Sequence, residues 1–219
     1  MDISHSNFRL GPIRRESFRG MVNLRGLAMN DNAYTTPFPT DIDALPSLTD
    51  FSLSNADLLG GSGQDLSFLG TKMLALTDLQ MSNVFLQTSI PTEIGRLTGL
   101  TSLNLSGGAL FGPIPTEIGR LTALKVLNLN SNFLTGTIPV EIASLTRLQV
   151  LDLGSNGLVG SIPTASLVAL TGLSLLNVAD NVGLSGNLSM LCSSVLNVSN
   201  LVALADCPIP VDCPCCQGC

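Results

Sequence analysis

The stretch IPTEIGRLTGLTSLNLSGGALFGPIPTEIGRLTALKVLNLNSNFLTGTIPVEIASLTRLQVLDLGSN, residues 90–156, repeats one pattern three times. The step Ile-Pro-x-Glu-Ile begins at Ile90, again at Ile114 and again at Ile138, so the period is 24 residues. A fixed period of this length indicates a chain built from similar structural units that stack on one another.

The same register extends over most of the chain. With Leu100 as position 1, leucine or a similar residue recurs at positions 1, 4, 6, 11 and 22, with Ile-Pro at 15 and 16. The spacings between successive units are 24, 28, 24, 24, 24 and 25 residues. The pattern L-x-x-L-x-L-x-x-N-x-L at this period is the leucine-rich-repeat signature. Seven units begin at Leu24, Leu48, Leu76, Leu100, Leu124, Leu148 and Leu173.

Each unit predicts a strand followed by a short turn. Leu103 and Leu105 alternate with polar residues, which is the period of a half-buried strand. Stacked strands share one core, so we expect a parallel sheet on the concave face of a right-handed α/β solenoid. The Ile-Pro step favours an extended segment. The TEIGRLT segment after it predicts a short 3₁₀ or irregular turn on the convex face, with Ile118 and Leu121 pointing inward.

Asparagine at position 9 has a predicted structural role, because its amide can bond backbone groups of the turn and of the neighbouring coil. Four units have it: Asn32, Asn132, Asn156 and Asn181. Three central units have Ala56, Val84 and Gly108 instead, and we expect weaker or water-filled turns there. The second unit is longer, and GGSGQD at 60–65 predicts a projecting loop.

The pattern L-x-G-x-I-P-x-E-I-G-x-L-T resembles plant-type extracellular leucine-rich repeats over about Leu24 to Asp206. Such repeats occur in receptor-like kinase ectodomains, receptor-like proteins and polygalacturonase-inhibitor-like proteins. The C-terminal sequence LADCPIPVDCPCCQGC resembles the cysteine-rich ends of repeat proteins from diatoms and related algae. The resemblance implies recognition of a ligand outside the cell.

Composition and motifs favour binding over catalysis. The chain has a net charge of −6, and the part after Arg25 is more acidic still, which disfavours binding to nucleic acid. The one histidine, His5, lies outside the repeats, and no phosphate-cradling loop is present. A column of glutamates at position 18 predicts a solvated convex face. We therefore expect no enzyme activity, no cofactor and no resident metal ion.

The three predicted regions are a polar basic segment at 1–23 that is poorly ordered, the solenoid at 24–191 and a cysteine-rich cap at 192–219. An open solenoid end needs a cap, and a small cap needs covalent support. Disulfides are the favoured interpretation, and a zinc site is the alternative. The six cysteines are Cys192, Cys207, Cys213, Cys215, Cys216 and Cys219.

The compartment is indicated by opposing features. Clustered cysteines favour an oxidising, extracellular space. The start of the sequence lacks an apolar leader segment, which favours the cytoplasm or a true start further upstream. No apolar run is long enough to span a membrane. We expect an extracellular or cell-surface protein with a cytoplasmic alternative, and N-glycosylation at one or more of the sequons Asn104, Asn187 and Asn197.

The predicted function is a non-catalytic module that binds a protein, peptide or polysaccharide through the concave face. The alternatives are an inhibitor of a secreted hydrolase and an intracellular scaffold. Positions 2, 3, 5, 7 and 8 of each unit point out of the sheet. An apolar column at position 3 stands beside acidic and amide side chains. The predicted ligand-binding residues are Asn104, Lys125, Val126, Asn128, Asn130, Val150, Asp152, Leu175 and Asp180.

Overall fold

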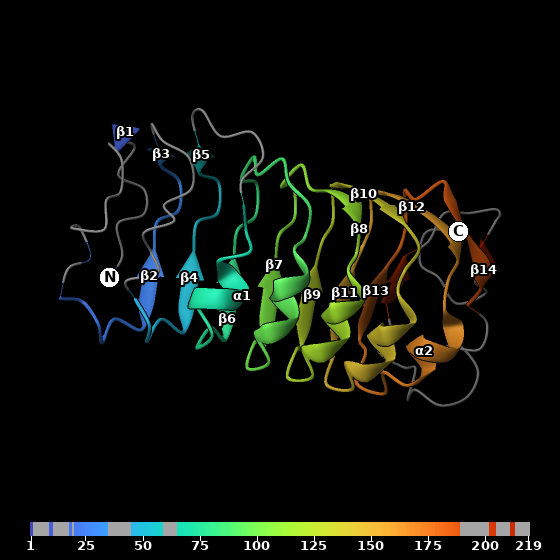
Figure 1. Cartoon of the computed structure of the whole chain (residues 1–219). Coiled ribbons are helices and arrows are strands. Elements are labelled where there is room, and N and C mark those ends of the chain that lie inside the picture. The colour runs from blue at the N-terminus through green and yellow to red at the C-terminus, as the bar shows by residue number, and fades with distance from the viewer. Residues whose placement is uncertain are drawn as a thin grey trace.

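The coils stack side by side from the N-terminal to the C-terminal end of the computed structural model (Figure 1). The structure describes residues 1, 9–10, 18, 20–34, 45–58, 65–188, 202–204 and 211–212. Each coil contributes one short strand to a sheet of eight parallel strands, in the order β15-β13-β11-β9-β7-β6-β4-β2. These strands are β2 (Gly26–Ala28), β4 (Asp50–Ser52), β6 (Asp78–Gln80), β7 (Ser102–Asn104), β9 (Val126–Asn128), β11 (Val150–Asp152), β13 (Leu175–Asn177) and β15 (Val202–Leu204).

The turns on the opposite side are mostly 3₁₀ helices, as the Ile-Pro-x-Glu-Ile step predicts. Each begins directly after the proline of this step, whose φ lies between −73° and −67°. Figure 1 shows these turns on the other side of the coils from the eight-stranded sheet. The helical elements are α1 (Leu69–Lys72), η3 (Thr92–Arg96), η4 (Thr116–Arg120), η5 (Val140–Ser144) and α2 (Thr164–Val168).

A second layer of strands, which the repeat pattern did not predict, follows the position-9 turn. It consists of a three-stranded sheet in the order β1-β3-β5 and a five-stranded sheet in the order β16-β14-β12-β10-β8. Positive φ at Gly112, Gly136 and Gly160, from 75° to 85°, recurs in this layer. Its strands are β1 (Arg9–Leu10), β3 (Ala33–Tyr34), β5 (Asp57–Leu58), β8 (Phe111–Pro113), β10 (Phe133–Gly136), β12 (Gly157–Ser161), β14 (Gly183–Asn187) and β16 (Val211–Asp212).

The core is one continuous cluster of apolar side chains, mostly leucine and isoleucine, between these layers. The predicted inward residues are buried: Leu103, Ile118 and Leu121 have no exposed surface and Leu105 has 1%. Strand and turn leucines from successive coils stack on one another, so each coil completes the core of its neighbours. The predicted architecture, a solenoid with a parallel sheet on one side and short turns on the other, is confirmed.

Three of the four position-9 asparagines, Asn132, Asn156 and Asn181, connect consecutive coils as predicted, and Asn32 bonds the carbonyls of Met29 and Asn30 in its own turn. The Asn132 Nδ2 group donates to the carbonyls of Leu105 and Leu129 at 3.0 and 2.9 Å. Its Oδ1 atom accepts from the amides of Gly108 and Leu110 at 3.0 and 2.9 Å. Asn156 and Asn181 bond their preceding coils in the same way. Each of these asparagines therefore satisfies buried backbone groups of the coil that precedes it.

Three coils have Ala56, Val84 or Gly108 at position 9 in place of asparagine. Their turns differ from the predicted weak or water-filled turns. Ala56 and Val84 are 2% and 0% exposed and belong to the hydrophobic core. Gly108 donates its amide to Asn132 of the next coil and accepts amide bonds from Leu86 and Gln87. Apolar packing thus replaces the polar side chain at Ala56 and Val84, and the expectation of a water-filled turn is wrong there.

Several sequence features lie mainly outside the described residues. The boundaries 1–23, 24–191 and 192–219 stay predictions, as do the disulfides and the projecting loop. Within the first region, β1 pairs with β3 and Phe18 is 4% exposed. Within the last region, β15 pairs with β13 in the eight-stranded sheet and β16 pairs with β14 in the five-stranded sheet.

After the long insertion, the Ser67 amide donates to the Asp65 carboxylate at 2.8 Å, and this bond lowers the pKa of Asp65.

Glycine in the convex turns sets how closely neighbouring coils stack. A Cβ atom on Gly119 would lie 2.6 Å from the carbonyl oxygen of Glu141 in the next coil. Gly95 has the same relation to Glu117, again at 2.6 Å. The equivalent residue of the following coil is Ala143, and the coil after it has α2 in place of a 3₁₀ helix. Gly70 in α1 has the same relation to the Glu93 carbonyl of η3, so close backbone approach requires glycine at all three of these turns.

Replacement of Gly119 by alanine is expected to lower the free energy of unfolding by about 1–3 kcal/mol, because two coils must separate. Gly99→Ala is the matched control, since the nearest atom to its Cβ would be 3.8 Å away. Urea unfolding followed by circular dichroism measures both variants. Equal stabilities of Gly119→Ala and Gly99→Ala would contradict the proposed close contact.

Candidate functional site

The candidate site is the surface of the eight-stranded sheet that points away from the core, here called the sheet face. Strand pairing places residues of equal repeat position side by side across all eight strands. The position-3 column changes from polar to apolar along the solenoid. In order, it contains Gly26, Asp50, Asp78, Ser102, Val126, Val150, Leu175 and Val202.

The apolar part of this column matches the sequence-based prediction. Val150 lies between Val126 on β9 and Leu175 on β13, in direct register with both. All three side chains are partly buried, whereas the leucines that alternate with them are fully buried in the core. The arrangement brings three apolar side chains together on one face of the sheet, where an apolar group of a ligand can pack.

The position-5 column is a hydrogen-bonded network rather than a set of free side chains. Asp152 Oδ1 accepts from Asn177 Nδ2 at 2.8 Å, from Asn130 Nδ2 at 3.2 Å and from the Gly154 amide at 3.2 Å. Asn104 and Asn128 each accept the backbone amide two residues further on, at 3.1 and 3.0 Å. These side chains stabilise the strand ends, so the network holds Asp152 in a fixed position between two amides.

Two predicted site residues lie at the border of the sheet face. Lys125 is an exposed position-2 residue directly before β9. Asp180 is exposed at position 8, has a φ of 57° and accepts a 3.0 Å hydrogen bond from the Ser155 hydroxyl. Every position-8 residue of the seven predicted repeat units has positive φ, which explains the Asp, Asn and Gly residues at this position. Lys125 and Asp180 therefore border the apolar column at opposite ends of the strands.

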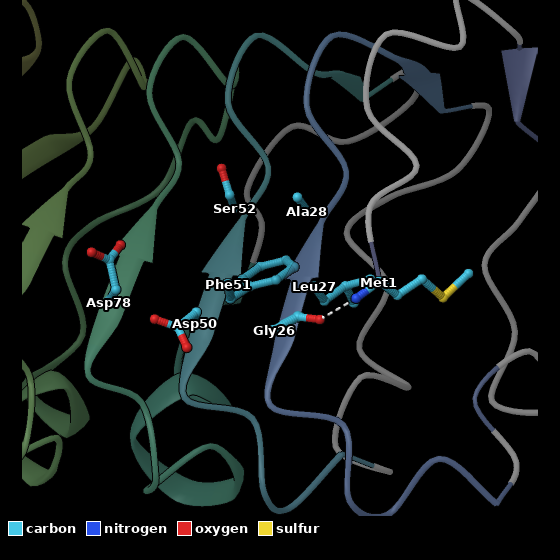
Figure 2. Close-up of a pocket in the computed structure, with 8 residues that line it drawn as sticks. All are labelled: Met1, Gly26, Leu27, Ala28, Asp50, Phe51, Ser52 and Asp78. Atoms are coloured by element: carbon cyan, nitrogen blue, oxygen red, sulfur yellow. Dashed lines mark hydrogen bonds between the residues drawn. The ribbon is translucent and has the colours of Figure 1, made fainter.

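The N-terminal end of the sheet face is hollowed. A cavity of about 280 Å³ is lined by Met1, Gly26, Leu27, Ala28, Asp50, Phe51, Ser52 and Asp78. Figure 2 shows Asp50 and Asp78 on neighbouring strands, with Gly26 and Ala28 on the strand beyond. A Cβ on Gly26 would have no atom within 4 Å, so the small residue leaves open space beside the two carboxylates. The sequence-based predictions did not include this cavity. The sequence does indicate it, because Gly26 at position 3 is followed by Asp50 and Asp78 at position 3 of the next two units.

The two carboxylates bond neutral groups. Thr49 donates its hydroxyl to Asp50 at 2.6 Å, and Gln80 donates its amide to Asp78 at 2.9 Å. Neither Asp50 nor Asp78 has a basic partner in the part of the chain that the structure describes. Two like charges on adjacent strands destabilise each other, so this end of the face favours a cationic group. The ammonium group of Met1, which donates to the Gly26 carbonyl at 2.8 Å, lines the same cavity.

The predicted modification sites differ in accessibility. Asn104 is partly buried on the sheet face, and its side-chain oxygen accepts from the Ser106 amide and hydroxyl. Asn187 is exposed at the end of β14. Asn197 and all six cysteines lie outside the described residues, so the glycosylation, disulfide and zinc interpretations stay predictions. No helix among the described residues has the length and apolar character that a membrane crossing requires.

Residues 122–167 match the family model described as Leucine Rich repeats (2 copies). Together with eight parallel strands in repeat register, this match shows the leucine-rich-repeat fold.

The chain is a leucine-rich-repeat solenoid.

Solved structures of plant receptor ectodomains resemble this solenoid. The plant peptide hormone receptor RGFR1 in complex with RGF2 has 29% identity and a TM-score of 0.79, over 89% of this chain and 30% of that chain. The Arabidopsis receptor kinase HAESA, in complex with the peptide hormone IDA and the co-receptor SERK1, has 31% identity and a TM-score of 0.78, over 89% and 31%. The solenoid thus spans about a third of these ectodomains. No curated protein matches the sequence.

A bacterial structure shares the fold alone. Internalin C2 from Listeria monocytogenes has 21% identity and a TM-score of 0.66, over 93% of this chain and 80% of that chain. The plant structures share more sequence with the solenoid, in agreement with the plant-type repeat pattern that the sequence contains.

Proposed function

We propose that this solenoid is a non-catalytic recognition module, acting outside the cell, that binds an extended peptide along its sheet face. The observation that carries the proposal is the position-3 column, which runs in register from Asp50 and Asp78 to Val126, Val150 and Leu175. The similar structures support it, because RGFR1 and HAESA are receptors in complex with peptide hormones.

The dimensions of the column fit a short peptide. Strands about 4.8 Å apart place Gly26 and Leu175 roughly 29 Å from each other. An extended peptide of about nine residues, at about 3.3 Å each, covers that length. Such a peptide crosses the strands and contacts one side chain of the column in each coil.

The side chains of the column predict which residue types the bound peptide has at each end. A lysine or arginine side chain fits the cavity beside Asp50 and Asp78, where it offsets two like charges. Apolar side chains at the other end of the peptide pack on Val126, Val150 and Leu175. Binding should weaken as salt is added, because the carboxylate contribution is screened.

The test uses a displayed library of random nine-residue peptides, selected on the immobilised chain. Enriched peptides should have a basic residue at one end and apolar residues at the other, in one preferred polarity. Val150→Glu should weaken an enriched peptide at least about tenfold, since it places a charge on the apolar surface. Fluorescence polarisation with the synthetic peptide measures the dissociation constant.

Thr146→Glu is the matched control, because it adds the same charge at an exposed residue outside the sheet face, two residues after the end of η5. Asp50→Asn combined with Asp78→Asn should remove the salt dependence. Enrichment of peptides without this pattern, or equal binding by Val150→Glu and Thr146→Glu, would move the binding site away from the sheet face.

A further inference from the structure

Asparagine recurs at position 5 of the sheet face in three coils, with one pattern of hydrogen bonding. Asn104, Asn128 and Asn177 each accept, through Oδ1, the backbone amide two residues further on, at 3.1, 3.0 and 3.1 Å. Because the oxygen of each side chain faces this amide, the other terminal atom is the amino group. The three amino groups therefore have equivalent orientations on their strands.

The chain supplies an acceptor to one of these amino groups. Asn177 Nδ2 donates to Asp152 Oδ1 on the neighbouring strand at 2.8 Å. In the equivalent place beside Asn128 lies Asn104, whose Oδ1 already accepts from the Ser106 amide and hydroxyl. Within the described part of the chain, the amino groups of Asn104 and Asn128 therefore have no acceptor.

Asp152 shows what such amino groups bind. Its Oδ1 atom accepts from Asn177 Nδ2 at 2.8 Å and from Asn130 Nδ2 at 3.2 Å, so two side-chain amides share one oxygen. Asn104 on β7 and Asn128 on β9 are register partners, which places their equivalent amino groups about 4.8 Å apart. An oxygen atom between them can accept from both at about 2.9 Å.

We propose that Asn104 and Asn128 together bind one main-chain carbonyl oxygen of the peptide on the sheet face. The inference rests on the proposed function and adds the residues that recognise the peptide main chain. Position 5 lies two residues, or about 7 Å, from the position-3 column on the same face. The carbonyl groups of an extended peptide alternate in direction, so every second one faces position 5. A carbonyl oxygen has two lone pairs and accepts from two donors.

Charge favours a neutral carbonyl over a carboxylate at this place. Asp152 is the register partner of Asn128, and its Oδ2 atom has no donor among the residues that the structure describes. A second carboxylate one strand away would be repelled. The basic residue Lys125 is three residues from Asn128, about 10 Å along the strand. Every peptide bond has a carbonyl, so enriched peptides should vary in their middle residues.

Asn104→Asp tests the pair of amides. The aspartate keeps an oxygen for the Ser106 amide and places an acceptor beside Asn128, as Asp152 does for Asn177. One donor is then lost and the other is occupied. Binding of the synthetic, most enriched nine-residue peptide should weaken at least about fivefold, which corresponds to the loss of one neutral hydrogen bond. Fluorescence polarisation in about 0.5 M salt, where the added charge is screened, measures the dissociation constant.

Thr146→Asp is the matched control, because it adds the same charge at an exposed residue outside the sheet face. It should bind the peptide like the wild type. Urea unfolding of Asn104→Asp should show no loss of stability, since the oxygen that bonds the backbone is retained.

Peptides with a modified main chain test the carbonyl contact. Each amide of the peptide is replaced in turn by an ester, whose carbonyl is a weaker acceptor. One replacement should weaken binding to the wild type at least about fivefold and leave binding to Asn104→Asp unchanged. N-methylation of the same amide removes its N–H and retains the carbonyl, so it distinguishes loss of the acceptor from loss of the donor.

The outcomes separate this inference from the proposed function. A peptide that Val150→Glu weakens, but that Asn104→Asp and every ester leave unchanged, would overturn the carbonyl contact alone. Failure to enrich any peptide would overturn both proposals. A glycan on Asn104 of the secreted protein would also overturn the carbonyl contact, because the glycan bonds the same Nδ2 atom.

Discussion

Replacement of Asn132 by alanine is expected to lower the free energy of unfolding by about 3–5 kcal/mol. The side chain is 6% exposed and bonds backbone groups of two coils. Alanine leaves two amides and up to three carbonyls without this partner, and each buried unsatisfied group costs about 1–3 kcal/mol. Guanidinium unfolding followed by circular dichroism measures the change.

Asn128→Ala is the control for this prediction. Asn128 has the same side chain, but it is partly exposed and accepts one amide bond, from Asn130 at 3.0 Å. Loss of one such bond should cost about 1 kcal/mol. If the two alanine variants were equally stable, the asparagine contacts between coils would not contribute to the fold as described.

Replacement of Leu127 by alanine is expected to lower the free energy of unfolding by about 2–5 kcal/mol. Leu127 is fully buried at position 4 of β9, between Leu103 and Leu151 of the neighbouring strands. Truncation removes apolar contacts in three coils and leaves a cavity that the stacked backbones cannot close. Urea unfolding followed by fluorescence of an added apolar dye, which reports exposed core, measures the effect.

Val126→Ala is the adjacent control, because this side chain is partly exposed on the sheet face. The Val126→Ala substitution should lower the free energy of unfolding by about 1 kcal/mol or less, because folding buries less apolar area at Val126 than at Leu127. A larger loss for Val126→Ala than for Leu127→Ala would reverse the assignment of inward and outward residues.

Repeat position alone predicted the large sheet and the core, because the strand period of two assigns each leucine to one side. Leu103, Leu127 and Leu151 recur at position 4, and no other alternation buries them together. The asparagine contacts of Asn132 were predictable for the same reason. An amide side chain at a fixed place in the turn has mainly backbone groups within reach.

The second strand layer and the true role of position 5 were not predicted. A glycine such as Gly136 with φ of 75° ends a strand in a way that hydrophobic spacing does not encode. Asp152 looks like a free outward carboxylate in the sequence, yet three donors surround one of its oxygens. The exposed apolar side chains of the second layer were also missed, although five consecutive coils have one phenylalanine or valine at position 10 or 12.

The asparagine contacts run in one direction along the chain. Asn132, Asn156 and Asn181 each bond buried groups of the preceding coil, so a coil is complete only after the next one has formed. On the ribosome, where the N-terminal part emerges first, each of these coils must wait for about 24 further residues before its amides are satisfied. Folding during synthesis is therefore expected to follow chain elongation with a delay of one coil. Each new coil supplies the asparagine side chain that satisfies the buried backbone amides of the coil before it.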